Sequence, residues 1–375
     1  MKNSGNTQKL FLLTTFVIFF SSCFKNEINN TNRIDFPVKY VSVKNFGVLG
    51  DGITDETIAF DKAQDYAFAN KVALFLPNGY YKINLSLKYD SLIIFGETKP
   101  QIKADSLIKG AVIIGAINAK NKKGIKMMDL GVWSQSDGIL TGDGLGNEPL
   151  NQTYSNITLL GTGYNGYKYG ILCQSGSAIT INNFTIAKFF HGIALKASNI
   201  NVSNIDAYNC GFTSIIIKSD VGANNLVENV KVSNVQIFGD TADVYAKGGT
   251  ILVQSYVDNA TTKNINISNV KSQNGGIATI YIEQVKGKVD NVTISNCSSY
   301  KCGDNPTRAT FDVVGGASNI SFTNCVSSYS NGIGYRTNKE ATKVSVMKSF
   351  ENNSIVAAYE GPFSYLELNN KLIIY

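Results

Sequence analysis

The chain has 375 residues, with 34 Lys and Arg against 28 Asp and Glu, and a formal net charge of +6. Glycine (34), tyrosine (19) and phenylalanine (20) are plentiful and proline (6) is scarce, which is typical of a β-rich chain with many turns. The mild positive charge suits an acidic partner. Because no dense block of Lys and Arg occurs, the sequence excludes a typical nucleic-acid binder.

The first segment of the chain reads as an export signal. Lys2 and Lys9 precede an apolar run from Leu10 to Phe20, which is too short to span a bilayer. The run ends in Phe20-Ser21-Ser22-Cys23, which resembles a bacterial lipobox, where the cysteine becomes lipidated and N-terminal. We expect a lipoprotein signal peptide at residues 1–22; an ordinary signal peptide cleaved nearby is the alternative.

A lipid on Cys23 would attach the protein to a membrane through a flexible tether at residues 23–37. Phe24 follows the cysteine, where an aspartate would favour retention at the inner membrane. We therefore expect an outer-membrane lipoprotein that faces either the periplasm or the cell surface.

The folded region is expected to begin with a turn, a helix and two strands. Gly50-Asp51-Gly52 is a turn, and Thr54 or Asp55 caps the helix. The strands are predicted at Val72–Leu76 and Tyr80–Ile83. The buried stripe of the helix is predicted to consist of four residues: Ala59, Ala63, Tyr66 and Ala67.

A short motif then recurs along the chain at intervals of 21 to 35 residues. Each copy alternates apolar and polar residues and has asparagine at its fifth position. The copies begin at Ile179, Ile200, Val230, Ile265, Val292 and Ile320, and their asparagines are Asn183, Asn204, Asn234, Asn269, Asn296 and Asn324. Ile125 and Ile157 extend the series without the asparagine. A regular strand at variable intervals predicts the coils of one solenoid, from which loops of different length project.

Stacking of the coils accounts for the asparagines. Strands of successive coils lie about 4.8 Å apart, so the asparagine amides can form a hydrogen-bonded ladder. The next position is predicted to point into the core, and it carries Phe184, Ile205, Val235, Val270, Cys297 and Cys325. We interpret Cys297 and Cys325 as core packing rather than redox centres. The helix would cover the strand edge at the open end of the solenoid.

A second strand occurs once per coil, as in Gly192-Ile193-Ala194-Leu195 and Ser214-Ile215-Ile216-Ile217. Counting by two places each isoleucine, and the residue two positions later, inside the solenoid. The residue after each quartet then faces outward. This outward row is Gly142, Gln174, Lys196, Lys218, Gln254, Glu283 and Val314, with Arg336 expected next. A polar row along an apolar sheet is the candidate substrate groove.

The start of the folded region resembles the N-terminal region of the pectate-lyase-like superfamily, in the branch of rhamnogalacturonases and epimerases. The resemblance rests on Phe46-Gly47, Gly50-Asp51-Gly52, Thr54-Asp55-Glu56-Thr57 and Leu76-Pro77-Asn78-Gly79-Tyr80-Tyr81. It implies an all-β, single-stranded, right-handed parallel β-helix of about ten coils over residues 38–375, with a short N-terminal capping helix. It also implies action on an acidic, pectin-like polysaccharide. The motif builds the cap and not the site, so it does not define the reaction.

A lyase, or an epimerase that shares its first step, is the leading prediction. Both remove the proton beside a uronate carboxyl group, and both need a base and a cation that neutralises the carboxylate. Lys196 and Lys218 stack on adjacent coils, where their like charges favour loss of one proton, so one can act as base and the other as carboxylate partner. Three further catalytic candidates are Glu283, Asp312 and Arg308. Four candidates for substrate binding are Tyr281, His191, Gln254 and Gln174.

Two alternatives remain at the level of sequence. A glycoside hydrolase of the polygalacturonase or rhamnogalacturonase type needs two suitably spaced carboxyl groups, for which Asp137 and Asp143 are candidates. The other alternative is a catalytically silent β-helix that binds glycan at the cell surface. No clustered acids indicate a calcium site, but a calcium ion is left open if Asp304, Asp312 and Glu283 converge. His191, the only histidine, is also interpretable as a structural turn residue.

Overall fold

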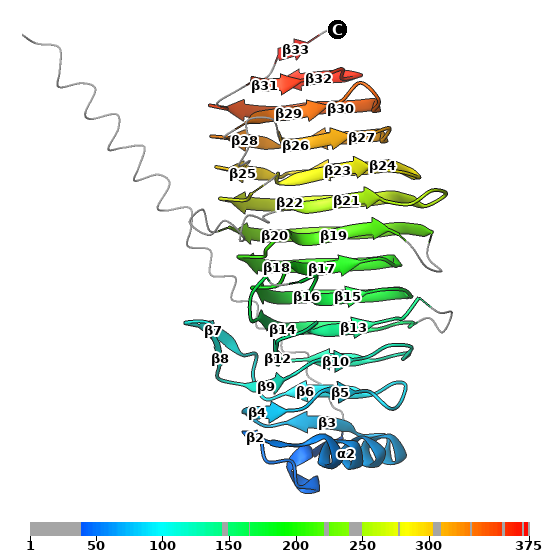
Figure 1. Ribbon diagram of the computed structural model, residues 1–375, viewed down its shortest axis with the longest axis vertical. Helices are drawn as coiled ribbons and strands as arrows, with labels where there is room; N and C mark the ends of the chain where they lie inside the picture. Colours follow the sequence, from blue (N-terminus) through cyan, green and yellow to red (C-terminus); the bar gives the residue numbers. More distant parts are fainter. Residues whose placement is uncertain are drawn as a thin grey trace, which may run out of the picture. The chain divides into compact units, whose positions relative to one another are not determined.

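The computed structural model describes residues 39–144, 149–164, 166–220, 225–239, 250–276, 278–302, 309–330, 332–354, 357–369 and 371–373. Within these residues the chain winds into a solenoid of stacked parallel strands with one α-helix at its lower end (Figure 1). The predicted single-stranded parallel β-helix with an N-terminal capping helix is therefore confirmed. Cys23 and the expected signal peptide and tether lie outside the described residues.

Two long sheets and one hairpin make up the solenoid. Sheet B contains β5 (Leu85–Ser86), β10 (Ile117–Asn118), β13 (Ile139–Thr141), β15 (Tyr169–Cys173), β17 (His191–Leu195), β19 (Thr213–Ser219), β21 (Ile251–Ser255), β23 (Ile280–Gln284), β26 (Ala309–Val314), β29 (Ile333–Thr337) and β31 (Ala357–Glu360). The hairpin consists of β7 (Gln101–Lys103) and β8 (Ser106–Ile108).

Sheet A forms the other faces of each coil. Its strands are β1 (Tyr40–Ser42), β2 (Asp51–Asp55), β3 (Ala73–Leu76), β4 (Gly79–Lys82), β6 (Ile93–Gly96), β9 (Ala111–Ile114), β11 (Lys126–Met128), β12 (Leu130–Ser134), β14 (Thr153–Gly161), β16 (Ser177–Ala187), β18 (Ser198–Tyr208), β20 (Leu226–Phe238), β22 (Thr261–Gln273), β24 (Lys288–Ser295), β25 (Ser298–Tyr300), β27 (Ser318–Thr323), β28 (Val326–Ser328), β30 (Thr342–Asn352), β32 (Tyr365–Leu368) and β33 (Lys371–Ile373).

Apolar residues of equivalent position stack inside the solenoid. In sheet B, Ile171 pairs with Ile193 and Ile193 with Ile215, and all three are buried. The predicted inward row of sheet A, from Phe184 to Cys325, is also buried. Cys297 and Cys325 are free thiols in this core, as expected for packing residues. Burial of these continuous rows is the main force that holds neighbouring coils together.

The asparagines do more than form a ladder. Asn234 donates to Asn204 at 3.1 Å, and Asn269 donates to Asn234 at 3.0 Å, as predicted. All six predicted asparagines also have φ between 53° and 57°, the left-handed region that asparagine tolerates better than other residues with a side chain. Each one therefore bends a long strand around a corner of the coil.

The sequence analysis missed two features of this series. A second ladder of left-handed asparagines lies five residues before Asn204, Asn234, Asn269 and Asn296, where Asn229 donates to Asn199 at 3.0 Å and Asn291 donates to Asn264 at 2.9 Å. In addition, Ile157 pairs with Phe184, so Asn156 and not Gly161 holds the ladder position in that coil. Ile157 therefore occupies the position after the ladder residue, and the prediction that it starts a copy of the motif was wrong.

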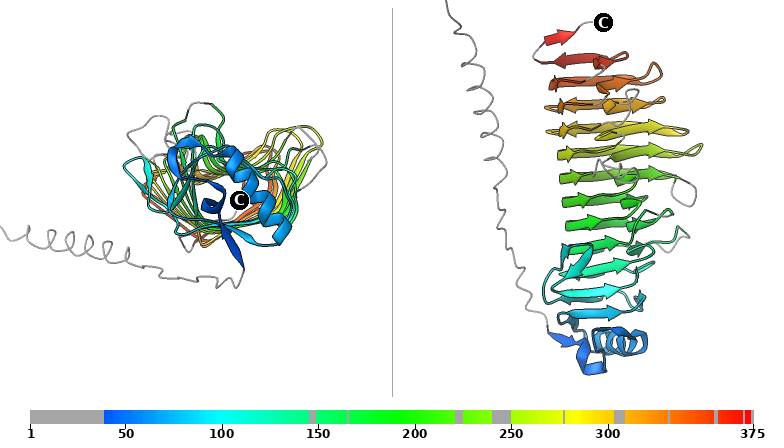
Figure 2. Two further views of the ribbon diagram at one scale, coloured as in Figure 1. Left: turned by 90° about the horizontal axis from the view of Figure 1, so that it is seen from below. Right: turned by 60° about the vertical axis from the view of Figure 1, so that its left-hand side comes forward.

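The capping helix α2 (Thr57–Asn70) follows the short 3-10 helix η1 (Val43–Phe46) and crosses the end of the solenoid (Figure 2). The N-cap of α2 is Glu56, whose side chain makes no cap hydrogen bond, so the prediction of Thr54 or Asp55 as the cap was wrong by at least one residue. Asp55 still accepts a hydrogen bond from the Thr57 amide at 3.0 Å. The buried residues of α2 are Phe60, Ala63, Gln64 and Ala67. Ala59 is partly buried against the core, whereas Tyr66 is exposed, so the predicted stripe was wrong at Tyr66.

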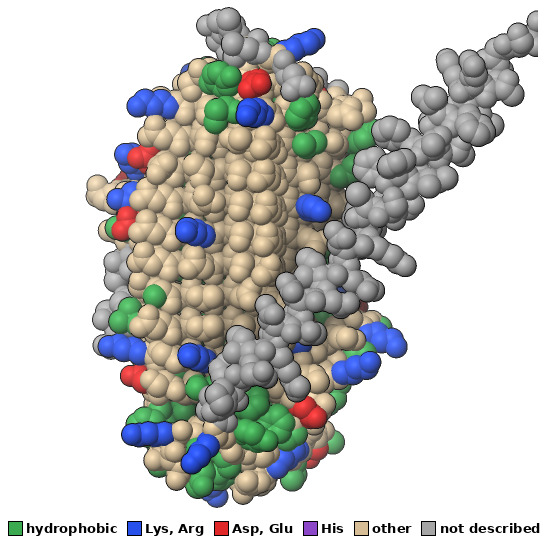
Figure 3. Space-filling view, turned by 180° about the vertical axis from the view of Figure 1, so that it is seen from behind, with side chains coloured by type: hydrophobic (Ala, Val, Ile, Leu, Met, Phe, Trp, Pro, Cys, Tyr) green, Lys and Arg blue, Asp and Glu red, His purple; other side chains and the backbone are tan. Residues whose placement is uncertain are grey.

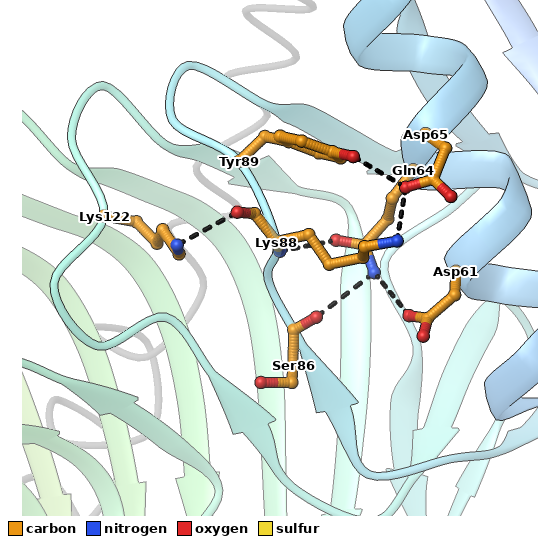
Figure 4. Close-up of polar contacts among 7 residues, drawn as sticks. All are labelled: Asp61, Gln64, Asp65, Ser86, Lys88, Tyr89 and Lys122. Atoms are coloured by element: carbon orange, nitrogen blue, oxygen red, sulfur yellow. Dashed lines mark hydrogen bonds and ion pairs between the residues drawn. The ribbon is translucent and has the colours of Figure 1, made fainter.

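Gln64 explains why a polar residue is buried in this helix. Its side chain donates to the Ser86 carbonyl at 3.1 Å and accepts from the Lys88 amide at 3.1 Å (Figure 4). Asp65 on the same helix contacts the Lys88 ammonium and accepts from the Tyr89 hydroxyl at 2.8 Å. The helix therefore satisfies polar groups of the first sheet B coil, which a solely apolar stripe would leave unpaired.

Candidate functional site

The predicted polar row exists on the outer face of sheet B. Lys218 pairs with Gln254, Gln254 with Glu283, and Glu283 with Val314. Lys196 and Gln174 come directly after β17 and β15, in line with this row. Arg336 is not its next member, because Arg336 pairs with Asp312 two positions earlier on the sheet.

Lys196 and Lys218 meet at one carboxylate, that of Asp220. The Asp220 Oδ2 atom lies 3.0 Å from the Lys196 ammonium and 3.3 Å from the Lys218 ammonium, and all three side chains are less than a fifth exposed. Among the described side chains, this cluster brings two ammonium groups and one carboxylate together on the outer face of sheet B. Such a centre can hold a ligand carboxylate, because partial burial strengthens charge–charge attraction.

The sequence analysis did not identify Asp220. A signal was present, because Asp220 lies two residues after Lys218 and therefore points to the same side of the extended chain. The sequence was interpreted as two lysines that repel each other, without the negative charge of Asp220. The structure instead shows a pair of lysines held in place by a shared partner.

Aromatic rings surround the lysine pair. The Lys218 ammonium lies 4.2 Å from the centroid of the Tyr256 ring, and the Lys196 ammonium lies 5.9 Å from that of Tyr169. Cations over ring faces are stabilised by the ring quadrupole. Tyr256 is 48% exposed, so a ring face or edge remains accessible to a bound sugar.

Tyr169 lies between the lysine pair and two further polar residues, Asp137 and His191. Its backbone amide donates to Asp137 at 2.9 Å, and its ring stacks on the His191 ring with centroids 5.0 Å apart. Burial, followed by the nearby carboxylates of Asp220 and Asp137, raises the pKa of Tyr169 above its usual value. Its phenol is therefore protonated at neutral pH, the state from which a proton can be donated.

His191 lies beside this tyrosine, at the paired position of the next strand of sheet B, and is buried. It is 4% exposed, and its Nδ1 atom lies 2.7 Å from the Thr213 hydroxyl. Burial, followed by the charges of Lys218 and Lys196, lowers the pKa of His191 to about 3. The predicted role in substrate binding does not fit this burial. The interpretation as a structural residue fits it, with the added function of supporting Tyr169.

An aromatic rim follows the edge of sheet B at which its strands begin. The rings of Phe190 and Phe212 stack with centroids 5.6 Å apart, and the Tyr167 ring lies 5.1 Å from that of Phe190. Tyr167 is 78% exposed. Exposed rings beside charged side chains can stack on the apolar faces of sugar rings.

A second polar cluster lies farther along the row. Gln254 and Tyr281 both donate to the Glu283 carboxylate, and the Tyr281 bond is 2.9 Å long. Asp312 sits beside Tyr281 in register but is 0% exposed, and it forms a two-bond ion pair with Arg336. A catalytic role for Asp312 does not fit a carboxylate that is fully buried and paired, so we correct it to a structural one.

The remaining predicted residues are not all gathered here. Gln174 lies at the lower end of the row, near the Gly144 backbone. Arg308 and Asp304 lie outside the described residues. Among the residues that the structure describes, no group of three or more His, Cys, Asp and Glu side chains is arranged to hold a metal ion.

The carboxyl pair proposed for hydrolysis is separated. Asp137 precedes β13 and binds an amide of the next coil, whereas Asp143 follows β13 and accepts from Asn121 of the preceding coil. The two carboxylates thus lie at opposite ends of β13 and bind groups of different neighbouring coils. The structure does not bring them together as the pair that glycoside hydrolysis needs.

The back of the molecule lacks comparable features. Figure 3 shows a flat face on which most visible side chains are neither charged nor hydrophobic, with isolated lysines and arginines. The concentration of charge and aromatic rings on sheet B therefore marks that sheet as the candidate site.

The fold is that of the right-handed parallel β-helix proteins related to pectate lyase. The family described as rhamnogalacturonase A/epimerase, pectate lyase-like, matches residues 40–240, which is more than half of the chain. The chain belongs to this family.

Known relatives are distant. Mannuronan C5-epimerase AlgE3 of Azotobacter vinelandii is 27% identical over 238 residues, which cover 56% of this chain but only 12% of that protein. An exopolygalacturonase of Thermotoga maritima superposes with a TM-score of 0.62 at 10% identity, over 90% of this chain and 93% of that one. The surface adhesin PfbA of Streptococcus pneumoniae superposes with a TM-score of 0.55 at 10% identity, over 89% and 94%. These structural likenesses establish the fold alone, and they include both enzymes and an adhesin.

Proposed function

We propose that this protein is a lyase, or a closely related epimerase, that acts on a uronate-containing polysaccharide bound along sheet B. The observation that carries the proposal is the Lys196–Asp220–Lys218 cluster beside the protonated phenol of Tyr169. This cluster combines an anion-binding charge with groups that can take and give a proton, which is what both reactions need.

The steps follow from the chemistry of a uronate. The Lys196 ammonium holds the carboxylate and stabilises the negative charge that develops when the C5 proton leaves. The Lys218 ammonium first releases a proton to solvent, and the resulting amine then takes the C5 proton. In a lyase the electron pair then forms the C4–C5 double bond as the C4–O bond breaks, and the Tyr169 hydroxyl donates its proton to the leaving oxygen. In an epimerase Tyr169 returns a proton to C5 from the opposite face.

Two other residues hold the lysines and Tyr169 in position. Asp220 holds the two lysine side chains at one point, so that less conformational freedom is lost when substrate binds. The ring of His191 stacks on the ring of Tyr169 and holds it in place. It adds no charge, because burial keeps the imidazole neutral. Neither residue needs to touch the substrate.

We also propose that the protein is anchored to the outer membrane by a lipid on Cys23. The lipobox-like ending of the apolar N-terminal run supports this proposal. Within the described ranges, no helix is long and apolar enough to cross a membrane. Metabolic labelling with a radioactive or alkyne-tagged fatty acid tests the anchor: Cys23→Ser should lose the label that the parent chain carries.

A product assay tests the proposed reaction. The protein is incubated with polygalacturonate, alginate and rhamnogalacturonan, with and without calcium, while ultraviolet absorbance and reducing ends are followed. A lyase produces unsaturated ends that absorb in the ultraviolet, and an epimerase incorporates deuterium at C5 from heavy water without cleavage. New reducing ends without absorbance would indicate hydrolysis instead, and no reaction on any acidic polymer would refute an enzymatic role.

A further inference from the structure

A strip of aromatic side chains lies on the outer face of sheet A, away from the sheet B groove. Tyr208, Phe238, Gln273 and Tyr300 occupy one outward row, in register from coil to coil. Tyr329 adjoins the upper end of this row, and its ring lies 5.5 Å from that of Tyr300. These five residues are called the aromatic strip below. They end or follow strands β18, β20, β22, β25 and β28, which stack one above another in Figure 1.

The rings of the strip are displayed to solvent rather than packed into a core. Tyr208, Tyr300 and Tyr329 are 37%, 40% and 46% exposed. The Tyr208 and Phe238 rings are nearly parallel, with centroids 5.1 Å apart and planes inclined by 9°. Successive coils are about 4.8 Å apart, so the row from Tyr208 to Tyr300 extends roughly 14 Å along the solenoid. This is a straight, repeating surface of a kind that suits a linear polymer.

Tyr329 is held in an unfavourable backbone conformation. Its φ is 55°, in the left-handed region that a bulky side chain rarely adopts. Equivalent left-handed positions in neighbouring coils carry Asn274, Lys301 and Asn353. A tyrosine at this position does not contribute favourable backbone geometry, and strain of this kind is often retained for function. The ring of Tyr329 therefore has a reason to be there other than folding.

The charges beside the strip favour an acidic ligand. The Lys301 ammonium lies 5.3 Å from the centroid of the Tyr300 ring, and Lys271 is exposed in the adjacent row. Gln236 and Gln273 supply amides that can hydrogen-bond to sugar hydroxyls. Asp206, a half-buried carboxyl, lies at the Tyr208 end, so the positive charge is concentrated toward Tyr300.

We propose that the aromatic strip is a second polysaccharide-binding surface, which takes a linear acidic polysaccharide by ring stacking and lysine contacts. Sugar rings present an apolar face to tyrosine and phenylalanine, and the carboxylates of the polymer meet Lys271 and Lys301. The surface is separate from the lysine pair on sheet B. It would hold polymer close to the protein whether or not the groove is catalytic, which raises the local concentration of chain segments.

The test compares matched double variants of the full chain in a Lys218→Ala background, so that polymer is not consumed. Tyr208→Ser/Tyr300→Ser removes two rings of the strip, and Tyr66→Ser/Tyr365→Ser removes two rings of similar exposure elsewhere. Dissociation constants are measured for polygalacturonate, alginate and an uncharged glucan by affinity electrophoresis. Circular dichroism melts confirm that each variant is folded.

We expect the strip variant to bind at least one acidic polymer about tenfold more weakly than its parent, and the control variant to bind it equally well. Turnover of short oligosaccharides by the strip variant with Lys218 intact should be unchanged, because these do not reach the strip. The proposal is overturned if the parent binds no acidic polymer, if both double variants weaken binding equally, or if the strip variant retains full affinity.

Discussion

His191 gives the stability of this protein a predictable dependence on pH. The imidazole is buried and stacks on the ring of Tyr169. Burial, followed by the charges of the two lysines, lowers its pKa to about 3. In the unfolded chain the same group has a pKa near about 6.5. Between these values the unfolded state binds a proton that the folded state does not, and the free energy of unfolding therefore falls as the pH is lowered.

The magnitude follows from the displacement of the pKa. Each pH unit below about 6.5 costs about 1.4 kcal/mol until the folded state itself takes up the proton. At pH 5 the loss attributable to His191 is thus about 2 kcal/mol relative to pH 7.5. Below about pH 3 both states are protonated and this contribution no longer changes with pH.

Two measurements check this reasoning. Because the chain has a single histidine, the imidazole resonance of the folded protein can be followed by NMR without assignment, and it should not titrate above about pH 4. Urea denaturation at pH 7.5 and pH 5 should show a larger loss of stability for the parent than for His191→Gln. A resonance that titrates near pH 6.5, or equal losses in the two proteins, would refute the account of a buried neutral imidazole.

Three further predictions concern the fold. Asn234→Ala should lower the free energy of unfolding by about 1–3 kcal/mol. Asn234→Gly should lower it by less, because glycine adopts the left-handed φ of 55° easily and only the ladder bonds are lost. Equal losses for the two variants in a denaturant titration would contradict this. Asp312→Ala should cost about 3 kcal/mol by removing the buried carboxylate that accepts two bonds from Arg336, and a neutral effect on the melting curve would argue against a structural ion pair. Burial raises the pKa of Cys173 and of Cys210 to about 12, so Ellman's reagent should label these thiols only after denaturation; labelling of the native protein would contradict their burial.

Much of the fold was predictable because each coil repeats the same local rules. Alternation with a period of two places Ile193 and Leu195 inside and Lys196 outside, and parallel stacking carries that order from coil to coil. The row from Lys196 to Glu283 could therefore be found without knowing the lengths of the intervening loops. The capping motif was equally local, since Glu56 accepts bonds from the Leu49 and Gly50 amides within the same turn.

The remaining features depend on contacts that alternation does not encode. Arg336 shares a row with Asp312 because the Tyr335 ring stacks on Phe311, with centroids 5.0 Å apart, and this fixes the register two residues from the predicted one. Asp312 was expected to face the groove, but its pairing with Arg336 buries it. Side-chain convergence also explains why Asp220 was missed: its role appears only when two lysines from different coils reach the same carboxylate.

The central claim is that the lysine pair on sheet B is the reactive centre. The most direct test is turnover of the accepted uronate polymer by Lys218→Ala and by Lys231→Ala, which removes an exposed lysine on the opposite face. We predict that Lys218→Ala lowers the rate at least about a hundredfold while Lys231→Ala leaves it unchanged. If Lys218→Ala retains the parent rate, the reaction takes place elsewhere and the account of the site is wrong.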